Sequence, residues 1–342
     1  ERTTLANGLK VELVPRPGIG FVQAQLVLDG GFAADPPGHP GTASLAMAML
    51  DEGTRTRSTL QISEQLALLG ASLGTGVSLD NAAVSLSALS DKLAPAFDIF
   101  ADVVLNATFP QSELERLRGL ALAGLRQEKN RANAMALRVL PKLLYGAGHP
   151  YAQPLTGTGT EAAISALTRE DLAEYRDRWF HPNHATLVVA GDTSMGELRP
   201  LLERLFGQWQ PGSAAPQPIA PAQGAPDDVL YILDRPGADQ SVIFVGQLMP
   251  PKANPDEFAI QAMNNILGGQ VSARINMNLR EDKHWSYGAY SVLRDARGQR
   301  PFFAYAPVQT DKTAEALQEL RGEIRAIAGK RPPTAGGLER VK

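Results

Sequence analysis

The sequence predicts an α+β protein with two homologous lobes, each a mostly antiparallel sheet packed with helices. Three observations lead to this prediction. Apolar and polar residues alternate in short segments, apolar residues recur with helical spacing in longer ones, and the order strand, strand, helix begins again after a Pro/Ala/Gln-rich stretch. The repeat indicates a duplication, with a first lobe over residues 1–210, a linker over 211–227 and a second lobe over 228–342. Because the second lobe is shorter than the first, we expect it to be truncated at its C-terminal end.

Composition narrows the classes of function. The 342 residues are enough for two cores, and 44% hydrophobic and 20% charged residues are ordinary for a globular protein. A net charge of −3 predicts no nucleic-acid surface, and no apolar run reaches the roughly 18 residues of a membrane span. The lack of cysteine excludes disulfides, thiolate metal sites and a cysteine nucleophile. It also favours a bacterial periplasmic or envelope location.

The first lobe is expected to begin with strands. Residues 3–15 read as two strands around an Asn-Gly turn, with Leu9, Val11 and Leu13 on one face. Residues 21–29 give a further alternating strand, followed by two glycines. These strands predict a sheet with one buried face.

Helices and further strands complete the first lobe. Residues 71–89 alternate small polar and apolar residues, which predicts a β-hairpin, and residues 185–192 predict a strand. Thr168 and Asp171 form a capping box at one helix start. Helical spacing predicts helices over 59–69, 93–105, 112–131, 168–180 and 195–206.

The second lobe repeats this order. Residues 229–234 and 240–249 predict two strands, and residues 255–269 predict a helix that ends near a pair of glycines. This match to the start of the first lobe is the basis for the predicted duplication.

The stretch 41–54, GTASLAMAMLDEGT, is a short apolar helix between two Gly-Thr pairs. None of its helical side chains can bind a metal or move a proton. A helix of Ala, Leu and Met is most often a buried core helix, so its composition alone predicts packing and no chemistry.

Three segments together resemble the pitrilysin/insulinase family of zinc metallopeptidases, which includes the mitochondrial processing peptidase. They are NGLKVELVP near the N-terminus, the run from Tyr145 to Asp192, and LGGQVSARINMNLREDKHWSYGAYS from Leu267 to Ser291. The resemblance extends over essentially the whole chain in order. It implies the two-lobed fold of that family.

The resemblance also implies that a zinc motif has been lost. Active members carry an inverted H-x-x-E-H motif in the helix between the Gly-Thr pairs, and a distant Glu completes the zinc site. In this sequence Ser44 and Ala48 stand at the histidine positions, Met47 at the position of the general base, and Gly124 at that of the distant Glu. We therefore expect no metal and no catalytic residue in this chain, with zinc held by a partner.

Arg280 and Tyr287, seven residues apart, match an Arg/Tyr pair of the family's second lobe. The resemblance implies that both side chains donate hydrogen bonds to the substrate and to the transition state in the partner's active site. Without the resemblance, a surface ion pair of Arg280 with Glu281 or Asp282 and a packed tyrosine would be the simpler interpretation.

The resemblance thus implies a non-catalytic partner of a peptidase of this type. The zinc-bearing part would be a separate subunit or the N-terminal half of a longer polypeptide, and peptides would be the substrates. The alternative is a structural or assembly protein of the same fold with no role in proteolysis. A self-sufficient hydrolase that uses Ser or Asp has little support, because neither a G-x-S-x-G motif nor a Ser-x-x-Lys pair occurs in a convincing context.

Overall fold

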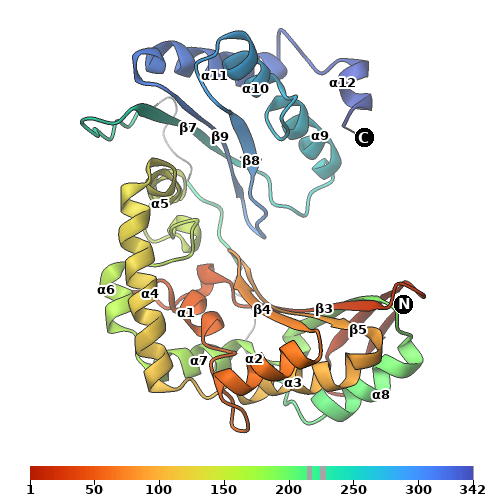
Figure 1. Ribbon diagram of the computed structural model, residues 1–342. Helices are drawn as coiled ribbons and strands as arrows, with labels where there is room; N and C mark the ends of the chain where they lie inside the picture. Colours follow the sequence, from red (N-terminus) through yellow and green to blue (C-terminus); the bar gives the residue numbers. More distant parts are fainter. Residues whose placement is uncertain (214–217, 224–228, 342) are drawn as a thin grey trace. The chain divides into compact units, whose positions relative to one another are not determined.

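The computed structural model describes residues 1–213, 218–223 and 229–341 of the chain (Figure 1). The contacts divide it into two compact units. The first unit consists of Glu1–Glu128 and Leu155–Pro218, and the second of Lys129–Pro154 and Ile219–Lys342. The predicted linker over 211–227 lies partly outside the described residues, which exclude 214–217 and 224–228.

The first unit is built on a six-stranded sheet. Its strands are β1 (Arg2–Thr4), β2 (Lys10–Pro15), β3 (Phe21–Asp29), β4 (Ser72–Val77), β5 (Asn81–Leu89) and β6 (Ala185–Gly191). They lie in the order β1-β2-β6-β3-β5-β4, and every pair is antiparallel except β2 with β6. The predicted strand over 21–29 and the hairpin over 71–89 are present, and the prediction of a mostly antiparallel sheet is confirmed.

One face of this sheet forms the core of the first unit. Leu9, Val11 and Leu13 are at most 1% exposed, as their alternation predicted. Alternate residues of β3, β5 and β6 are buried in the same way, because side chains of a strand point to opposite faces. The helices of this unit are α1 (Thr42–Ala48), α2 (Thr59–Leu68), α3 (Leu93–Asn106), α4 (Gln111–Asn130), α6 (Glu161–Ala166), α7 (Arg169–Trp179) and α8 (Met195–Phe206).

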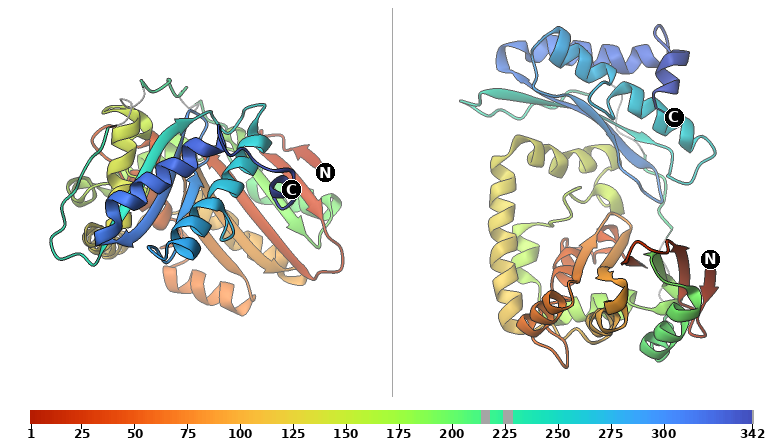
Figure 2. Two further views of the ribbon diagram at one scale, coloured as in Figure 1. Left: turned by 90° about the horizontal axis from the view of Figure 1, so that it is seen from above. Right: turned by 45° about the vertical axis from the view of Figure 1, so that its right-hand side comes forward.

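The second unit contains a three-stranded antiparallel sheet in the order β7 (Gln240–Met249), β9 (Arg300–Gln309), β8 (Tyr290–Leu293). Helices α9 (Glu257–Leu267), α10 (Arg274–Asn276) and α11 (Thr313–Ile327) lie on one face of it, as Figures 1 and 2 show. Helix α5 (Ala132–Tyr145) contacts β7 from the other face, where Leu140 packs over Gly246. The short helix α12 (Ala335–Glu339) follows.

The two units repeat one piece of architecture. The order β3-β5-β4 in the first sheet recurs as β7-β9-β8 in the second. In both units the middle strand ends in a single 3₁₀ turn, Ser90–Lys92 after β5 and Thr310–Lys312 after β9, and a helix follows directly. Shared strand order and a shared strand-to-helix turn support the predicted duplication.

One predicted strand is wrong. Residues 229–234 are not part of any sheet, and their apolar side chains are exposed, Ile232 by 83%. The matching strand of the first unit, β2, pairs with β6, which lies between β2 and β3. No described strand of the second unit takes the place of β6, and β7 pairs only with β9 among the described residues. The segment 229–234 therefore has no strand to pair with in the described part of the chain.

The segment 129–154 belongs to the second unit by its contacts, although the sequence places it in the first lobe. The Tyr145 hydroxyl donates to the Gln299 carbonyl oxygen at 2.8 Å, and the Gly298 amide donates to the Tyr151 hydroxyl at 3.0 Å. Both tyrosines are at most 4% exposed. These buried contacts attach the segment to the loop before β9.

Within the described ranges, no helix has both the length and the hydropathy that crossing a membrane requires.

Candidate functional site

Helix α1 carries three of the four positions at which the sequence resemblance to the family predicted a degenerate zinc motif. The Ser44 hydroxyl donates to the Gly157 carbonyl oxygen at 2.6 Å, and the Met47 side chain is 1% exposed in the core. Ala48 and Gly124 lie on exposed parts of α1 and α4, and a Cβ atom on Gly124 would meet no atom within 4 Å. A hydroxyl that already serves a carbonyl, a buried thioether, a methyl group and a glycine do not fit a zinc ion, which needs His, Cys or carboxylate ligands.

No other described residues replace that site. Among residues 1–213, 218–223 and 229–341, no group of three or more His, Asp or Glu side chains is placed to hold a metal ion.

The first Gly-Thr pair has a structural role at the start of α1. Gly41 has a φ of +101°, and a Cβ atom there would lie 2.7 Å from Ile164. The Asp35 carboxylate accepts hydrogen bonds from the amides of Gly41, at 2.6 Å, and Ala43, at 2.8 Å. Burial raises the pKa of Asp35 to about 7, although these amides oppose the rise. Asp35 thus satisfies the free amides at the helix start.

The second Gly-Thr pair is held by a buried carboxylate of α3. Thr54 and Thr56 donate their hydroxyls to Asp102 at 2.6 and 2.8 Å, and Arg57 donates to the same oxygen at 2.6 Å. Asn106 donates to the other oxygen at 2.8 Å. Burial alone would raise the pKa of Asp102, but these hydrogen bonds together lower it below its ordinary value. The Gly-Thr pairs therefore fix the ends of the α1 segment, whatever the helix itself carries.

Arg280 and Tyr287, the two predicted contact residues, lie together in the second unit. The guanidinium carbon of Arg280 is 5.1 Å from the centre of the Tyr287 ring, a cation–π distance. Arg280 also pairs with Glu281 at 3.2 Å, as the simpler interpretation expected. Tyr287, however, is not packed in a strand, because 85% of it is exposed.

The backbone on both sides of Tyr287 is anchored to the core. The Ser286 hydroxyl donates to the Pro307 carbonyl oxygen of β9 at 2.6 Å. The Ala289 amide donates to the side chain of Asn276, which is fully buried, at 3.1 Å. An exposed aromatic side chain on a turn fixed at both ends is presented to solvent in a defined position.

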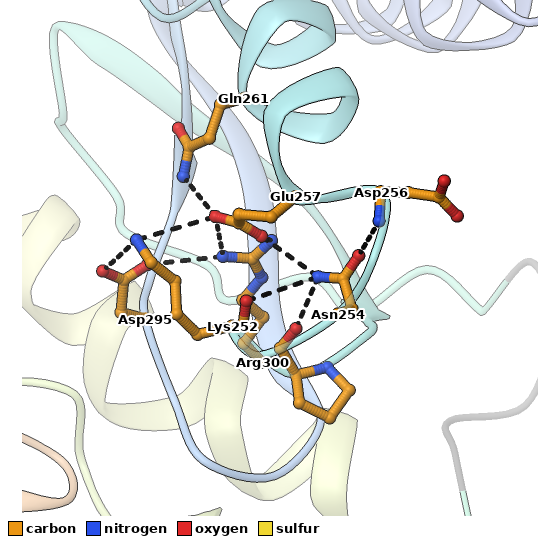
Figure 3. Close-up of polar contacts among 8 residues, drawn as sticks. Lys252, Asn254, Asp256, Glu257, Gln261, Asp295 and Arg300 are labelled. Atoms are coloured by element: carbon orange, nitrogen blue, oxygen red, sulfur yellow. Dashed lines mark hydrogen bonds and ion pairs between the residues drawn. The ribbon is translucent and has the colours of Figure 1, made fainter.

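A second polar cluster, which the sequence did not reveal, surrounds Arg300 at the start of β9 (Figure 3). The guanidinium is fully buried and donates to both oxygens of Glu257 on α9, at 3.1 and 2.5 Å. It also contacts Asp295 at 3.3 Å, and Lys252 pairs with Asp295 at 2.8 Å. The hydrogen bond from Arg300 is the main reason that the pKa of Glu257 falls to about 2. The cluster joins α9 to β9, and no sequence pattern marks Arg300.

Family models match both halves of the chain. Residues 10–159 match the model described as insulinase (peptidase family M16), and residues 166–342 match the model described as peptidase M16 inactive domain. The curated relatives include an uncharacterized zinc protease from Mycobacterium leprae, 23% identical over 332 residues, with 96% of this chain and 73% of the relative covered. Another is the uncharacterized zinc protease YmxG from Bacillus subtilis, 22% identical, with 95% of this chain and 78% of the relative covered.

Solved structures agree with the fold. A peptidase M16 inactive domain from Pseudomonas fluorescens superposes with a TM-score of 0.92 at 26% identity, with all of this chain and 82% of that chain covered. A protease from Helicobacter pylori superposes with a TM-score of 0.90 at 19% identity and the same coverage. The periplasmic protease PqqL from Escherichia coli gives 0.76 at 19% identity, with 39% of its chain covered. Since M16 models match its two halves in order, and one of them alone spans more than half of its residues, the chain belongs to peptidase family M16.

Proposed function

We propose that this chain is the zinc-less partner of an M16 zinc peptidase, to which it contributes part of the wall of the substrate chamber. In this proposal Arg280 and Tyr287 contact peptide substrates that the zinc-bearing subunit, or the zinc-bearing N-terminal half of one longer polypeptide, cleaves. Zinc is held by that partner and not by this chain. The proposal rests chiefly on the presentation of Arg280 and Tyr287 on an anchored turn.

The two side chains supply the right chemistry for such a contact. A guanidinium carries fixed charge and several N–H donors, and a phenol carries one O–H donor. Donors of this kind stabilise the negative charge that develops on the carbonyl oxygen when a peptide bond is attacked. Tyr287 is 85% exposed and the Arg280 side chain is 36% exposed, so both groups are available to a ligand from outside the chain.

Loss of chemistry in the first unit supports the division of labour. Ser44, Met47, Ala48 and Gly124 cannot form the zinc site that the relatives' description as zinc proteases implies for those proteins. A periplasmic or envelope location is proposed with it. Its supports are the absence of cysteine from the sequence and the likeness to the periplasmic protease PqqL.

The test is a complex reconstituted from this chain and a zinc-bearing M16 peptidase chain. Tyr287→Phe removes one hydroxyl and keeps the ring, so assembly should be unchanged. Loss of one transition-state donor is expected to lower turnover about 10²–10³-fold. Tyr231→Phe is the matched control, because Tyr231 is another exposed tyrosine of the same unit, 58% exposed, and should leave turnover unchanged.

The contrary result is equally clear. If Tyr287→Phe keeps turnover within about twofold of the wild-type value in an assembled complex, the expected loss of a transition-state donor is absent. The alternative, a structural or assembly protein of the M16 fold, would then replace the proposal.

A further inference from the structure

His284 lies at the end of the helical segment that carries Arg280. That segment is a π-helix over Met277–Asp282, directly after α10. His284 has a φ of +57°, and only one other described residue besides glycines, Phe109, has a positive φ. A residue in this left-handed conformation just after a helix ends it and turns the chain, and glycine usually fills the position. A histidine there is an exception that calls for a reason.

The imidazole ring makes a second contact to the same helix end. Its Nδ1 atom lies 3.0 Å from the carbonyl oxygen of Arg280. Because a carbonyl oxygen only accepts hydrogen bonds, Nδ1 must carry the hydrogen. The ring thus satisfies one of the carbonyl groups that the end of a helix leaves without a backbone partner. The carbonyl of the preceding residue, Leu279, accepts from the amides of Trp285 at 3.0 Å and Ser286 at 3.2 Å.

These contacts reverse the chain over Arg280. After His284 the backbone returns along the helix end, since Trp285 and Ser286 both bond to Leu279. The next residue is Tyr287, whose ring then lies 5.1 Å from the guanidinium carbon of Arg280. The left-handed backbone and the ring contact of His284 therefore act on both members of the pair.

We propose that His284 is a positioning residue that sets the contact between Arg280 and Tyr287. Its backbone conformation places the tyrosine over the guanidinium, and its Nδ1–H group holds the carbonyl of the arginine. The geometric statement is independent of the proposed function, and only its consequence for turnover rests on that function.

Fluorine NMR on the isolated chain, labelled with 3-fluorotyrosine, tests the geometry. The chain has seven tyrosines, and the resonance of Tyr287 is identified by its loss in Tyr287→Phe. Arg280→Ala gives the frequency of the ring without its guanidinium contact. His284 is exposed, so its variants leave the core intact.

Three variants distinguish a change in the position of the Tyr287 ring from the general effect of a substitution at the surface. His284→Val should move the Tyr287 resonance most of the way to its frequency in Arg280→Ala, because a β-branched residue strongly disfavours positive φ. His284→Asn should keep the wild-type frequency, since Asn tolerates this conformation and its amide can donate to a carbonyl. Asp282→Val is the control, because it adds the same side chain two residues earlier, where φ is not positive.

The proposal is overturned if His284→Val leaves the Tyr287 resonance at the wild-type frequency, or if Asp282→Val moves it equally. In the reconstituted complex, His284→Val should lower turnover about 10- to 100-fold, because Arg280 and Tyr287 would be misplaced. His284→Asn should have the turnover of the wild-type complex. A moved resonance with unchanged turnover would leave the positioning role intact and contradict the proposed function instead.

Discussion

The α1 segment and the turn after the π-helix differ in the exposure of the side chains to which the sequence assigned a function. In the α1 segment, two of the positions expected for the zinc motif serve the fold, since Met47 is 1% exposed and Ser44 donates to a carbonyl of its own unit. In the turn after the π-helix, the backbone is anchored but Tyr287 is 85% exposed. The first region uses these side chains inside the fold, whereas the second presents polar groups at the surface.

The α1 segment is held at its ends by residues other than Ser44, Met47 and Ala48. Asp35 and Asp102 hold the two ends of the α1 segment through hydrogen bonds that do not involve the motif positions. Residues outside the motif positions therefore hold both ends of the helix. The two Gly-Thr pairs of this chain therefore have a structural role at the ends of the α1 segment.

The largest expected effect on stability comes from placing a glutamate at position 47, where the family motif has its general base. Met47→Glu places a carboxylate without a partner in the core and should lower the free energy of unfolding by about 3–5 kcal/mol. Met47→Leu keeps an apolar side chain of similar volume and should change it by less than about 1.5 kcal/mol. Urea unfolding followed by circular dichroism measures both. A similar small change for both variants would mean that position 47 is not part of the core.

An intermediate effect concerns the two carboxylates of the α1 frame. The folded pKa of Asp35 is raised to about 7 from an ordinary value of 3.8, so its stabilising contribution is complete below that ordinary value and is lost as pH rises through about 7. The pKa of Asp102 is lowered, so its contribution is present above 3.8 and is lost as pH falls.

Unfolding free energies measured from about pH 2 to 8 check these opposite signs, because the Asp102 contribution is lost only below its ordinary pKa of 3.8. Asp35→Asn should remove the decline toward neutral pH, and Asp102→Asn should leave that decline in place. An unchanged decline in Asp35→Asn would show that another group titrates in this range.

The smallest effect on stability is expected in the second region. Tyr287→Ala removes an exposed ring and one cation–π contact, which should change the free energy of unfolding by less than about 1 kcal/mol. The same urea measurement as for Met47 makes the two regions directly comparable. A loss as large as that of Met47→Glu would mean that Tyr287 serves the fold, and the contrast between the regions would disappear.

Much of the fold could be predicted because its signals are local. The alternation of Leu9, Val11 and Leu13 and the capping box of Thr168 and Asp171 are sequence patterns that act over a few residues, and both appear in the structure. The strand expected over 229–234 failed for a different reason. Its continuous run of apolar residues is suitable for a strand, but pairing needs a neighbouring strand, and sequence alone cannot supply one.

The candidate site was predictable in part. The spacing of Arg280 and Tyr287 identified the pair through a family resemblance, and the structure places them in contact. The role of His284 was not visible, because a left-handed backbone at a histidine has no signature in the sequence. Arg300 was missed as well, since its partners Glu257 and Asp295 come from separate elements that only the folded chain brings together.

The assignment of 129–154 to the second unit has a consequence for protease nicking. The chain passes between the units at three places, after residues 128, 154 and 218. A single cut between Pro218 and Ile219 would give an N-terminal fragment that contains 129–154 and a C-terminal fragment that contains Gly298 and Gln299. Because Tyr145 and Tyr151 bond to those two residues, the fragments would remain associated without a covalent link. A nicked preparation would elute as one species and separate only under denaturing conditions.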